Sequence, residues 1–184
     1  METKCALVID GALNLSTGWL RNILKTRQRA VDFSEENAER CFGSTASSAS
    51  RDVCMSVEKS INEFKMMLDG DNEQAVLCEF GVRFHAVIRD HLKSFKLSIG
   101  MMGGLMVISD MSAYLDAAKK FHIPLVQNLF ETLHALCNLL MQPPENIRQV
   151  YTGEHLANLD REVLHSFVQL RSDYNSQNLQ KFFT

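Results

Sequence analysis

Apolar residues recur every three or four positions along most of this chain, and that spacing predicts α-helices. We expect long helices over about residues 2–30, 44–68, 71–95, 105–121 and 124–141. A short helix is expected between Pro144 and Gly153, and a last helix begins after Asp160, which is predicted to cap it. The pattern therefore predicts about five long helices and one or two short ones.

The first helix carries more apolar residues than contact with a single neighbour requires. Its main stripe consists of Cys5, Val8, Ala12, Leu15, Trp19 and Ile23, and the residues that widen it are Ile9, Leu13, Leu20 and Leu24. A stripe of this width predicts a helix packed against more than one neighbour. No capping residue precedes the helix, so we expect the chain to be a piece of a longer protein.

Turn-forming residues mark the joints between the predicted helices. Ser44 is predicted to cap the second helix, Gly70 suits a left-handed turn before the third, and Pro124 suits the first position of the fifth. Asp71 and Gln74 have the spacing of a capping box at the start of the third helix. Residues 98–104 are expected to form a loose join.

Two segments are predicted to lie outside the helical core. Residues 31–43 form a polar connection, and residues 175–184 form a polar tail that is expected to fray. Within this tail, Leu179, Phe182 and Phe183 are the residues that could dock it onto the bundle.

Composition narrows the fold class. The 184 residues include nine Gly and three Pro, whereas average usage gives roughly 22 of the two together. A many-stranded sandwich or barrel needs more turn residues than this chain has. The expected fold is therefore all-α, with residues 1–184 forming one elongated antiparallel helical bundle.

Charge and cysteine usage limit the compartment and the partners. The net charge is −3 and the pI is about 6.1, whereas a domain that binds nucleic acid is usually strongly basic, so no nucleic-acid partner is expected. The longest apolar stretch, Leu97 to Ile108, is too short to span a bilayer. Five cysteines without a C-x-x-C pair fit a reducing compartment such as the cytoplasm.

The sequence contains no motif that predicts catalysis, a cofactor or a metal ion. His85 and His91 are six residues apart, on nearly opposite faces of one predicted helix, so they cannot share a metal ion. The run from Gly100 to Gly104 lacks the preceding strand and the lysine of a phosphate-binding loop. No G-x-S-x-G nucleophile elbow is present. We therefore expect a protein that is not an enzyme and that binds no cofactor.

The end of the first helix combines one aromatic residue with four cations, Trp19, Arg21, Lys25, Arg27 and Arg29. One interpretation is a surface that binds an anionic membrane or a partner. The other places Trp19 in the core and has the cations complement the helix dipole. We favour the second, because the acidic residues between positions 32 and 39 follow directly and would weaken a basic patch.

Three segments carry a family resemblance. They are Phe80–His85 with His91 and Leu92, then Ile123–Leu125 with Leu129–Leu140, and then Gly153–Asp160 with Leu164–Tyr174. Together these segments resemble the C-terminal end of exocyst complex component 5, a family of vesicle-tethering subunits. The resemblance covers most of this chain but only the last part of the much longer family members, and it therefore implies that residues 1–184 are the C-terminal bundle of a longer chain.

The resemblance implies a non-catalytic helical-rod subunit of the exocyst, the complex that tethers secretory vesicles to the plasma membrane before fusion. It implies a cytoplasmic protein, peripheral at exocytic sites, whose partners are other exocyst subunits. It also implies regulation by small GTPases and weak or indirect membrane contact. No family catalytic residue or binding motif carries over, and residues 31–50 look unlike the family. The family's tail is arginine-rich, whereas residues 175–181 read NSQNLQK, so no role of a basic tail carries over either.

Overall fold

The computed structural model describes residues 2–33, 46–95, 99–153 and 156–183. These residues form seven α-helices and three short 3-10 helices, and they contain no β-strand. The long helices are α1 (Glu2–Arg27), α3 (Ser48–Met67), α4 (Gly70–Lys93), α5 (Met101–Lys119) and α6 (Pro124–Asn138). The short ones are η1 (Ala30–Phe33), η3 (Pro144–Asn146), α7 (Ile147–Tyr151), α8 (Arg161–Val168) and η4 (Leu179–Phe182). The predicted all-α bundle of five long helices and two short α-helices is confirmed.

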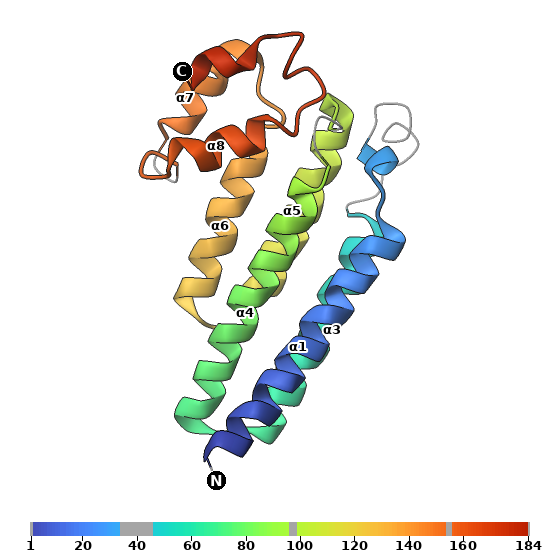
Figure 1. Ribbon diagram of the computed structural model, residues 1–184, viewed down its shortest axis with the longest axis vertical. Coiled ribbons are helices and arrows are strands. Elements are labelled where there is room, and N and C mark those ends of the chain that lie inside the picture. The colour runs from blue at the N-terminus through green and yellow to red at the C-terminus, as the bar shows by residue number, and fades with distance from the viewer. Residues whose placement is uncertain (1, 34–45, 96–98, 154–155, 184) are drawn as a thin grey trace.

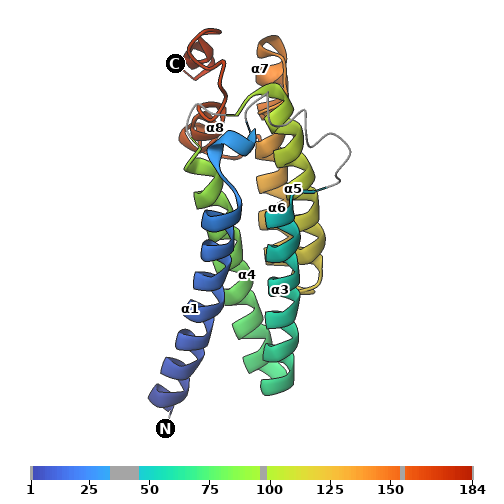
Figure 2. The same ribbon diagram turned by 90° about the vertical axis from the view of Figure 1, so that its right-hand side faces the viewer.

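The long helices lie alongside one another and run alternately in opposite directions, which makes the molecule elongated (Figure 1). The main contacts of α1 are with α3 and α4, whereas α5 packs on α3 and α6, and α4 also packs on α6. Helix α1 therefore lies at one side of the bundle (Figure 2). Helices α7, α8 and η4 form a cap at the end of the bundle far from the N-terminus (Figure 1).

The core forms where the apolar stripes of α3 and α4, which follow the spacing of three and four residues seen in the sequence, meet the later helices. All of the following stripe residues are buried: Ala49, Val53, Val57, Ile61, Phe64, Val76, Leu77, Phe80, Phe84, Val87, Ile88 and Leu92. Phe84 is the centre of an aromatic cluster, with its ring centroid 4.6 Å from that of Phe130 and 6.0 Å from that of Tyr114. The 3.6-residue period was thus sufficient to predict the buried side of these two helices.

Several predicted helix ends need correction. Helix α1 ends at Arg27 and not near residue 30. Ser44 lies outside the described residues, and the residue that caps α3 is Ser47, whose side chain accepts a hydrogen bond from the Ser50 N–H at 3.0 Å. Helix α4 already begins at Gly70, after Asp69 as N-cap, so the predicted capping box does not start it. Gly70 has the predicted positive φ, +53°.

The predicted loose join at residues 98–104 is also wrong over its described part, because α5 begins at Met101. Gly103 lies inside this helix at a close approach. A Cβ at this position would lie 1.9 Å from the carbonyl oxygen of Phe33. The glycine is therefore a contact point between η1 and α5 and not a chain break.

Other predicted joints agree with the structure. Pro124 occupies the start of α6, where its missing N–H is not needed for helix formation. Asp160 caps α8, with its Oδ1 accepting a hydrogen bond from the Glu162 N–H at 3.0 Å. Helix α6 ends at Asn138, three residues before the predicted end at Met141.

The two segments expected outside the core are attached to it where the structure describes them. In the connection, Phe33 is buried with its ring 4.8 Å from that of Phe95, while residues 34–45 lie outside the described residues. In the tail, Leu179 is fully buried, and Phe182 and Phe183 pack against the core. The described tail is therefore docked, and not frayed, through the residues that the sequence marked for docking.

Candidate functional site

Exposed apolar side chains and two glycines share one side of α1, where spacings of three, four or seven residues bring them together. They are Leu7, Val8, Gly11, Leu15, Gly18 and Trp19, and we call them the outer face of α1. The four large side chains, in that order, are 71%, 73%, 78% and 58% exposed. Apolar residues grouped in this way mark a contact surface more often than scattered single residues do.

The opposite side of α1 explains why the outer face is open. Leu13, Leu20 and Leu24 are buried in the core. Thr17 is also buried, and its hydroxyl donates a hydrogen bond to the Leu13 carbonyl at 2.8 Å. A helix at the side of the bundle buries only one of its two apolar sides. The interpretation that places Trp19 in the core is therefore wrong.

Gly11 and Gly18 make the outer face uneven. A Cβ added at either position would meet nothing within 4 Å. The two glycines are seven residues apart, which corresponds to about 10.5 Å along the helix, and they leave gaps between the large side chains. A glycine in a helix costs about 0.5–1 kcal/mol relative to alanine. No close packing among the described residues requires either glycine.

The four predicted cations do not form one patch. Arg21 and Lys25 are exposed, one turn apart on α1, and neither forms an ion pair with another described residue. Arg27 points to a different side and forms an ion pair with Asp52 of α3. Arg29 lies beyond the end of α1. The structure therefore keeps only Arg21 and Lys25 together, beside the C-terminal end of the outer face.

The N-terminal half of α1 is tied to α4 by Arg83. Its guanidinium lies 2.7 Å from Asp10 Oδ1 and 2.6 Å from Glu79 Oε1, and it donates a hydrogen bond to Asn14 Oδ1 at 2.8 Å. Hydrogen bonds to these two carboxylates raise the pKa of Arg83. Because Asp10 is already paired, the unpaired charge that the described residues of α1 place beside the outer face is the positive charge of Arg21 and Lys25.

A buried polar cluster joins four segments near the other end of α1. Asp110 of α5 accepts hydrogen bonds from Ser47 Oγ at 2.7 Å and from Gln28 Nε2 at 2.8 Å. Gln28 Oε1 lies 2.9 Å from His91 Nε2, and since an amide oxygen can only accept, the imidazole donates from Nε2. These bonds connect the residue that follows α1 and the N-cap of α3 to α4 and α5. Asp110 is almost fully buried, so the cluster is closed to a substrate.

Burial also changes the titration of this cluster. It raises the pKa of Asp110, although the bonds from Ser47 and Gln28 act in the opposite direction. It lowers the pKa of His91 to about 4, so the imidazole is neutral at pH 7. The sequence reasoning missed the cluster. The sequence feature that pointed to it is Asp110, which lies near Val107 and Met111 on the buried side of α5.

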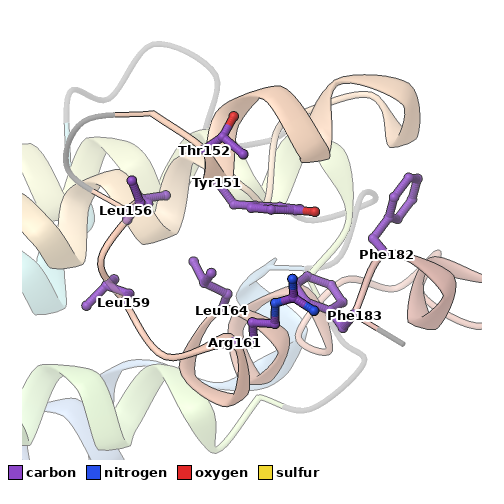
Figure 3. A pocket seen from close by; sticks show the side chains of 9 residues that line it. Tyr151, Thr152, Leu156, Leu159, Arg161, Leu164, Phe182 and Phe183 are labelled. Atoms are coloured by element: carbon purple, nitrogen blue, oxygen red, sulfur yellow. The ribbon is translucent and has the colours of Figure 1, made fainter.

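The C-terminal cap contains a pocket of about 260 Å³ (Figure 3). Most of its walls are apolar or aromatic, and the lining residues are Tyr151, Thr152, Leu156, Ala157, Leu159, Arg161, Leu164, Phe182 and Phe183. The volume is below the range of roughly 300–1,000 Å³ that is usual for small-molecule sites. The Thr152 hydroxyl is bonded to the carbonyls of Arg148 and Gln149. The lining therefore provides no nucleophile paired with a base.

The described residues offer no other chemical site. They contain no group of three His, Cys, Asp or Glu side chains that could hold a metal ion. Among the described helices, none is long and apolar enough to cross a bilayer. The described residues thus form an α-helical bundle with an exposed apolar face on α1, and this fold defines the class of helical-bundle proteins.

Comparison with known proteins agrees with this fold class and identifies the family. Residues 1–183 match the family described as exocyst complex component Sec10-like, alpha-helical bundle, and the chain belongs to that family. It is 44% identical over 184 residues to exocyst complex component 5 of Mus musculus and of Homo sapiens, covering 100% of this chain and 26% of each relative. The protein of that name from Drosophila melanogaster is 36% identical over 174 residues, which are 95% of this chain and 24% of the relative. The chain thus spans about a quarter of the length of these relatives, and the resemblance found in the sequence is confirmed.

Proposed function

We propose that this chain is a non-catalytic scaffold part of the exocyst, which tethers secretory vesicles to the plasma membrane before fusion. Family membership supports a place in that complex. The single observation that carries the proposal is the outer face of α1. Its apolar side chains are exposed to water on an ordered helix, and covering them with a partner lowers the free energy of the complex.

The proposed mechanism is mechanical. Five long helices packed on a common core form a stiff rod, and a stiff element transmits force and position between the subunits that it joins. Complete burial of one large apolar side chain contributes about 1.5–3 kcal/mol, so the four large residues of the outer face offset a large part of the entropy cost of association, which is about 4–15 kcal/mol. No step of this mechanism requires a catalytic group, a cofactor or a metal ion.

The proposal includes the location and the partners of the chain. It acts in the cytoplasm, peripherally at exocytic sites of the plasma membrane, in contact with other exocyst subunits. A small GTPase is proposed as a regulator of the assembly. Nucleic acid is not proposed as a partner, since the net charge is −3.

The test is co-purification with exocyst subunits that are quantified individually by mass spectrometry. The double variant Leu15→Glu, Trp19→Glu places two charges on the outer face and is expected to lower recovery about tenfold, which corresponds to about 1.4 kcal/mol. Met66→Glu is the matched control, because Met66 is an exposed apolar residue of α3. The parent chain failing to co-purify with exocyst subunits would contradict the proposal, and equal losses for variant and control would contradict the role of the outer face.

A second candidate function is peripheral membrane binding by the basic end of α1, with Arg21, Lys25, Arg27 and Arg29 as the cationic surface. The exposure of Trp19 favours it, because tryptophan suits the boundary between lipid and water. The ion pair of Arg27 with Asp52 weakens it. Flotation with liposomes containing anionic lipid separates the two candidates. Flotation that disappears when the four cations are changed to glutamate would favour the membrane, whereas no flotation of the parent chain removes this candidate.

A further inference from the structure

We propose that the outer face of α1 receives one α-helix of another exocyst subunit, packed antiparallel to α1, with acidic residues at its N-terminal end beside Arg21 and Lys25. This inference rests on the proposed function and adds to it the kind of partner, its direction and its charge. Three features of the structure lead to it: the row of residues four apart, the gaps at the two glycines, and the position of the unpaired cations.

The first feature is a ridge suited to helix packing. Leu7, Gly11, Leu15 and Trp19 follow one another at intervals of four residues, which is the row that forms the commonest ridge in contacts between helices. Between Leu7 and Trp19 the ridge is about 18 Å long. This length corresponds to about three turns of a facing helix, which would bring its own apolar residues to the ridge at intervals of three and four.

The second feature is the pair of gaps in this face. Gly11 interrupts the ridge, and Gly18 lies beside it, each with open space where a Cβ would stand. Side chains of a facing helix fill such gaps, and the two backbones then approach more closely. A lipid surface gains nothing from a gap between apolar side chains, since it presents no fixed side chain to fill it. The glycines therefore favour a protein helix over a membrane.

The third feature is the position of the charge. Arg21 and Lys25 have no acidic partner among the described residues, and both lie toward the C-terminal end of α1. Acidic side chains are commonest and most stabilising near the N-terminus of a helix, where they complement the helix dipole. A helix that meets both cations with its acidic N-terminal turn runs antiparallel to α1, and in that direction the two helix dipoles also attract.

The same charges argue against a second copy of this chain as the occupant. In an antiparallel pair of α1 helices, Arg21 and Lys25 of one copy would face the N-terminal half of the other. The acid described there, Asp10, is already paired with Arg83. Among the side chains that the structure describes on that half of α1, the cations would therefore find no free carboxylate. A membrane is also less favoured, since two cations contribute only about 1 kcal/mol each near an anionic surface.

The experiment is site-specific photocrosslinking in the assembled exocyst that contains this chain. A photoreactive phenylalanine analogue replaces Val8, Leu15 or Asn22 in three separate preparations, and Glu63 on the exposed surface of α3 in a control preparation. Each crosslinked partner segment is then located by mass spectrometry. Both helices rise by the same distance per residue, and antiparallel helices run in opposite directions. The site crosslinked from position 22 should therefore lie about 14 residues N-terminal to the site crosslinked from position 8, in the same partner helix. Acidic residues should lie within one turn of the site crosslinked from position 22.

A variant tests the gaps without disturbing the ion pairs. Gly11→Leu together with Gly18→Leu fills both gaps, and because nothing lies within 4 Å of either Cβ position the bundle itself should still fold. Circular dichroism checks this folding. The crosslinking yield at Leu15 is expected to fall at least about fivefold, the equivalent of about 1 kcal/mol, while the control change Met66→Leu leaves it unaltered.

The outcomes separate this inference from the proposed function. Crosslinks to one helix of another subunit in the expected order, lost on filling the gaps, support it. Crosslinks in the opposite order, to lipid, to a second copy or to another segment of the same chain overturn it, as does a yield at Leu15 no higher than at Glu63. If the chain is present in the complex and such a result is obtained, this inference fails while the proposed place of the chain in the exocyst stands. If the chain does not enter the complex at all, the proposed function fails with it.

Discussion

The outer face of α1 and the C-terminal segment 171–183 differ in what covers their apolar side chains. The outer face lies on a regular helix of 26 residues, yet Leu15 and Trp19 are mostly exposed. The C-terminal segment has little regular structure, yet its Leu179 is fully buried. Regular secondary structure is therefore a poor guide to tight packing here, and the position of a segment relative to the bundle decides what becomes buried.

The cationic side chains of the two regions differ in the same way. In the C-terminal segment, Arg171 is buried, its guanidinium bonds Asp173 at 2.7 and 2.8 Å, and it donates to the carbonyl of Leu139 at 2.9 Å. On α1, Arg21 and Lys25 are exposed and unpaired among the described residues. One region uses its cation to attach a chain end to the bundle, and the other leaves its cations accessible from outside.

The largest effect is expected for Arg171→Ala. Removing this side chain leaves Asp173 without its partner and the buried Leu139 carbonyl without a donor, so the free energy of unfolding should fall by about 3–5 kcal/mol. Chemical denaturation followed by circular dichroism measures it. Arg161→Ala, at an exposed arginine without an ion pair among the described residues, should change stability by less than about 0.5 kcal/mol. Similar values for the two variants would contradict the role of Arg171.

A pair of identical substitutions compares the two regions directly. Leu179→Ala removes a fully buried side chain and should cost about 2–5 kcal/mol of unfolding free energy. Leu15→Ala removes one that is 78% exposed and should stay within about 0.5 kcal/mol of the parent. Both values come from the same denaturation experiment. The comparison fails if Leu15→Ala is as destabilising as Leu179→Ala in the isolated chain.

The third prediction concerns pH and the cluster that anchors the C-terminal end of α1. The pKa of His91 is about 4 in the folded chain, below its usual value of about 6.5. The folded state therefore binds fewer protons than the unfolded state, and stability falls as the pH drops from above 6.5 toward 4. Between pH 7 and pH 5 this contribution amounts to about 2 kcal/mol at most, because part of the imidazole meets solvent.

His91→Gln isolates this effect, since its amide can still donate to Gln28 Oε1 while carrying no titrating group. The variant should lose less stability than the parent between pH 7 and pH 5, as measured by denaturation midpoints at both values. Asp110, whose pKa is raised by burial, acts in the opposite direction in both proteins, so the difference between them reports on the imidazole. Identical losses would mean that His91 takes up its proton as easily in the folded chain as in the unfolded one.

The smallest expected effect is an increase in stability. Gly11→Ala should stabilise the isolated chain by about 0.5–1 kcal/mol, because alanine loses less backbone entropy in a helix and the new Cβ meets nothing within 4 Å. Gly103→Ala is the counterpart inside the bundle, where the Cβ would lie 1.9 Å from the Phe33 carbonyl oxygen, and should destabilise by about 1–3 kcal/mol or more. Thermal unfolding shows whether each variant is more or less stable than the parent chain. A loss of stability for Gly11→Ala would indicate that the outer face is covered within the chain itself.

Much of the fold followed from local patterns, and the candidate site did not. The stripes of α3 and α4 predicted their buried sides correctly, because each has a single apolar side that must face the core. In α1 two apolar sides compete, and the periodicity alone cannot tell which one meets the bundle. The cluster around Asp110 was missed for a related reason, since its members, Gln28, Ser47 and His91, come from distant parts of the chain.

The sequence by itself determined the all-α class, the long helices, the turn at Gly70, the start of α6 at Pro124 and the cap of α8 at Asp160, and it also carried the family resemblance. These features depend on residues close together in the chain, where spacing and backbone preference act directly. Only the tertiary structure decided that Trp19 is exposed, that Arg27 is paired with Asp52 while Arg21 and Lys25 have no ion-pair partner among the described residues, and that the tail is docked by Arg171 and Leu179. Burial and ion pairing depend on which segments meet in space, and that information is not contained in any one stretch of the chain.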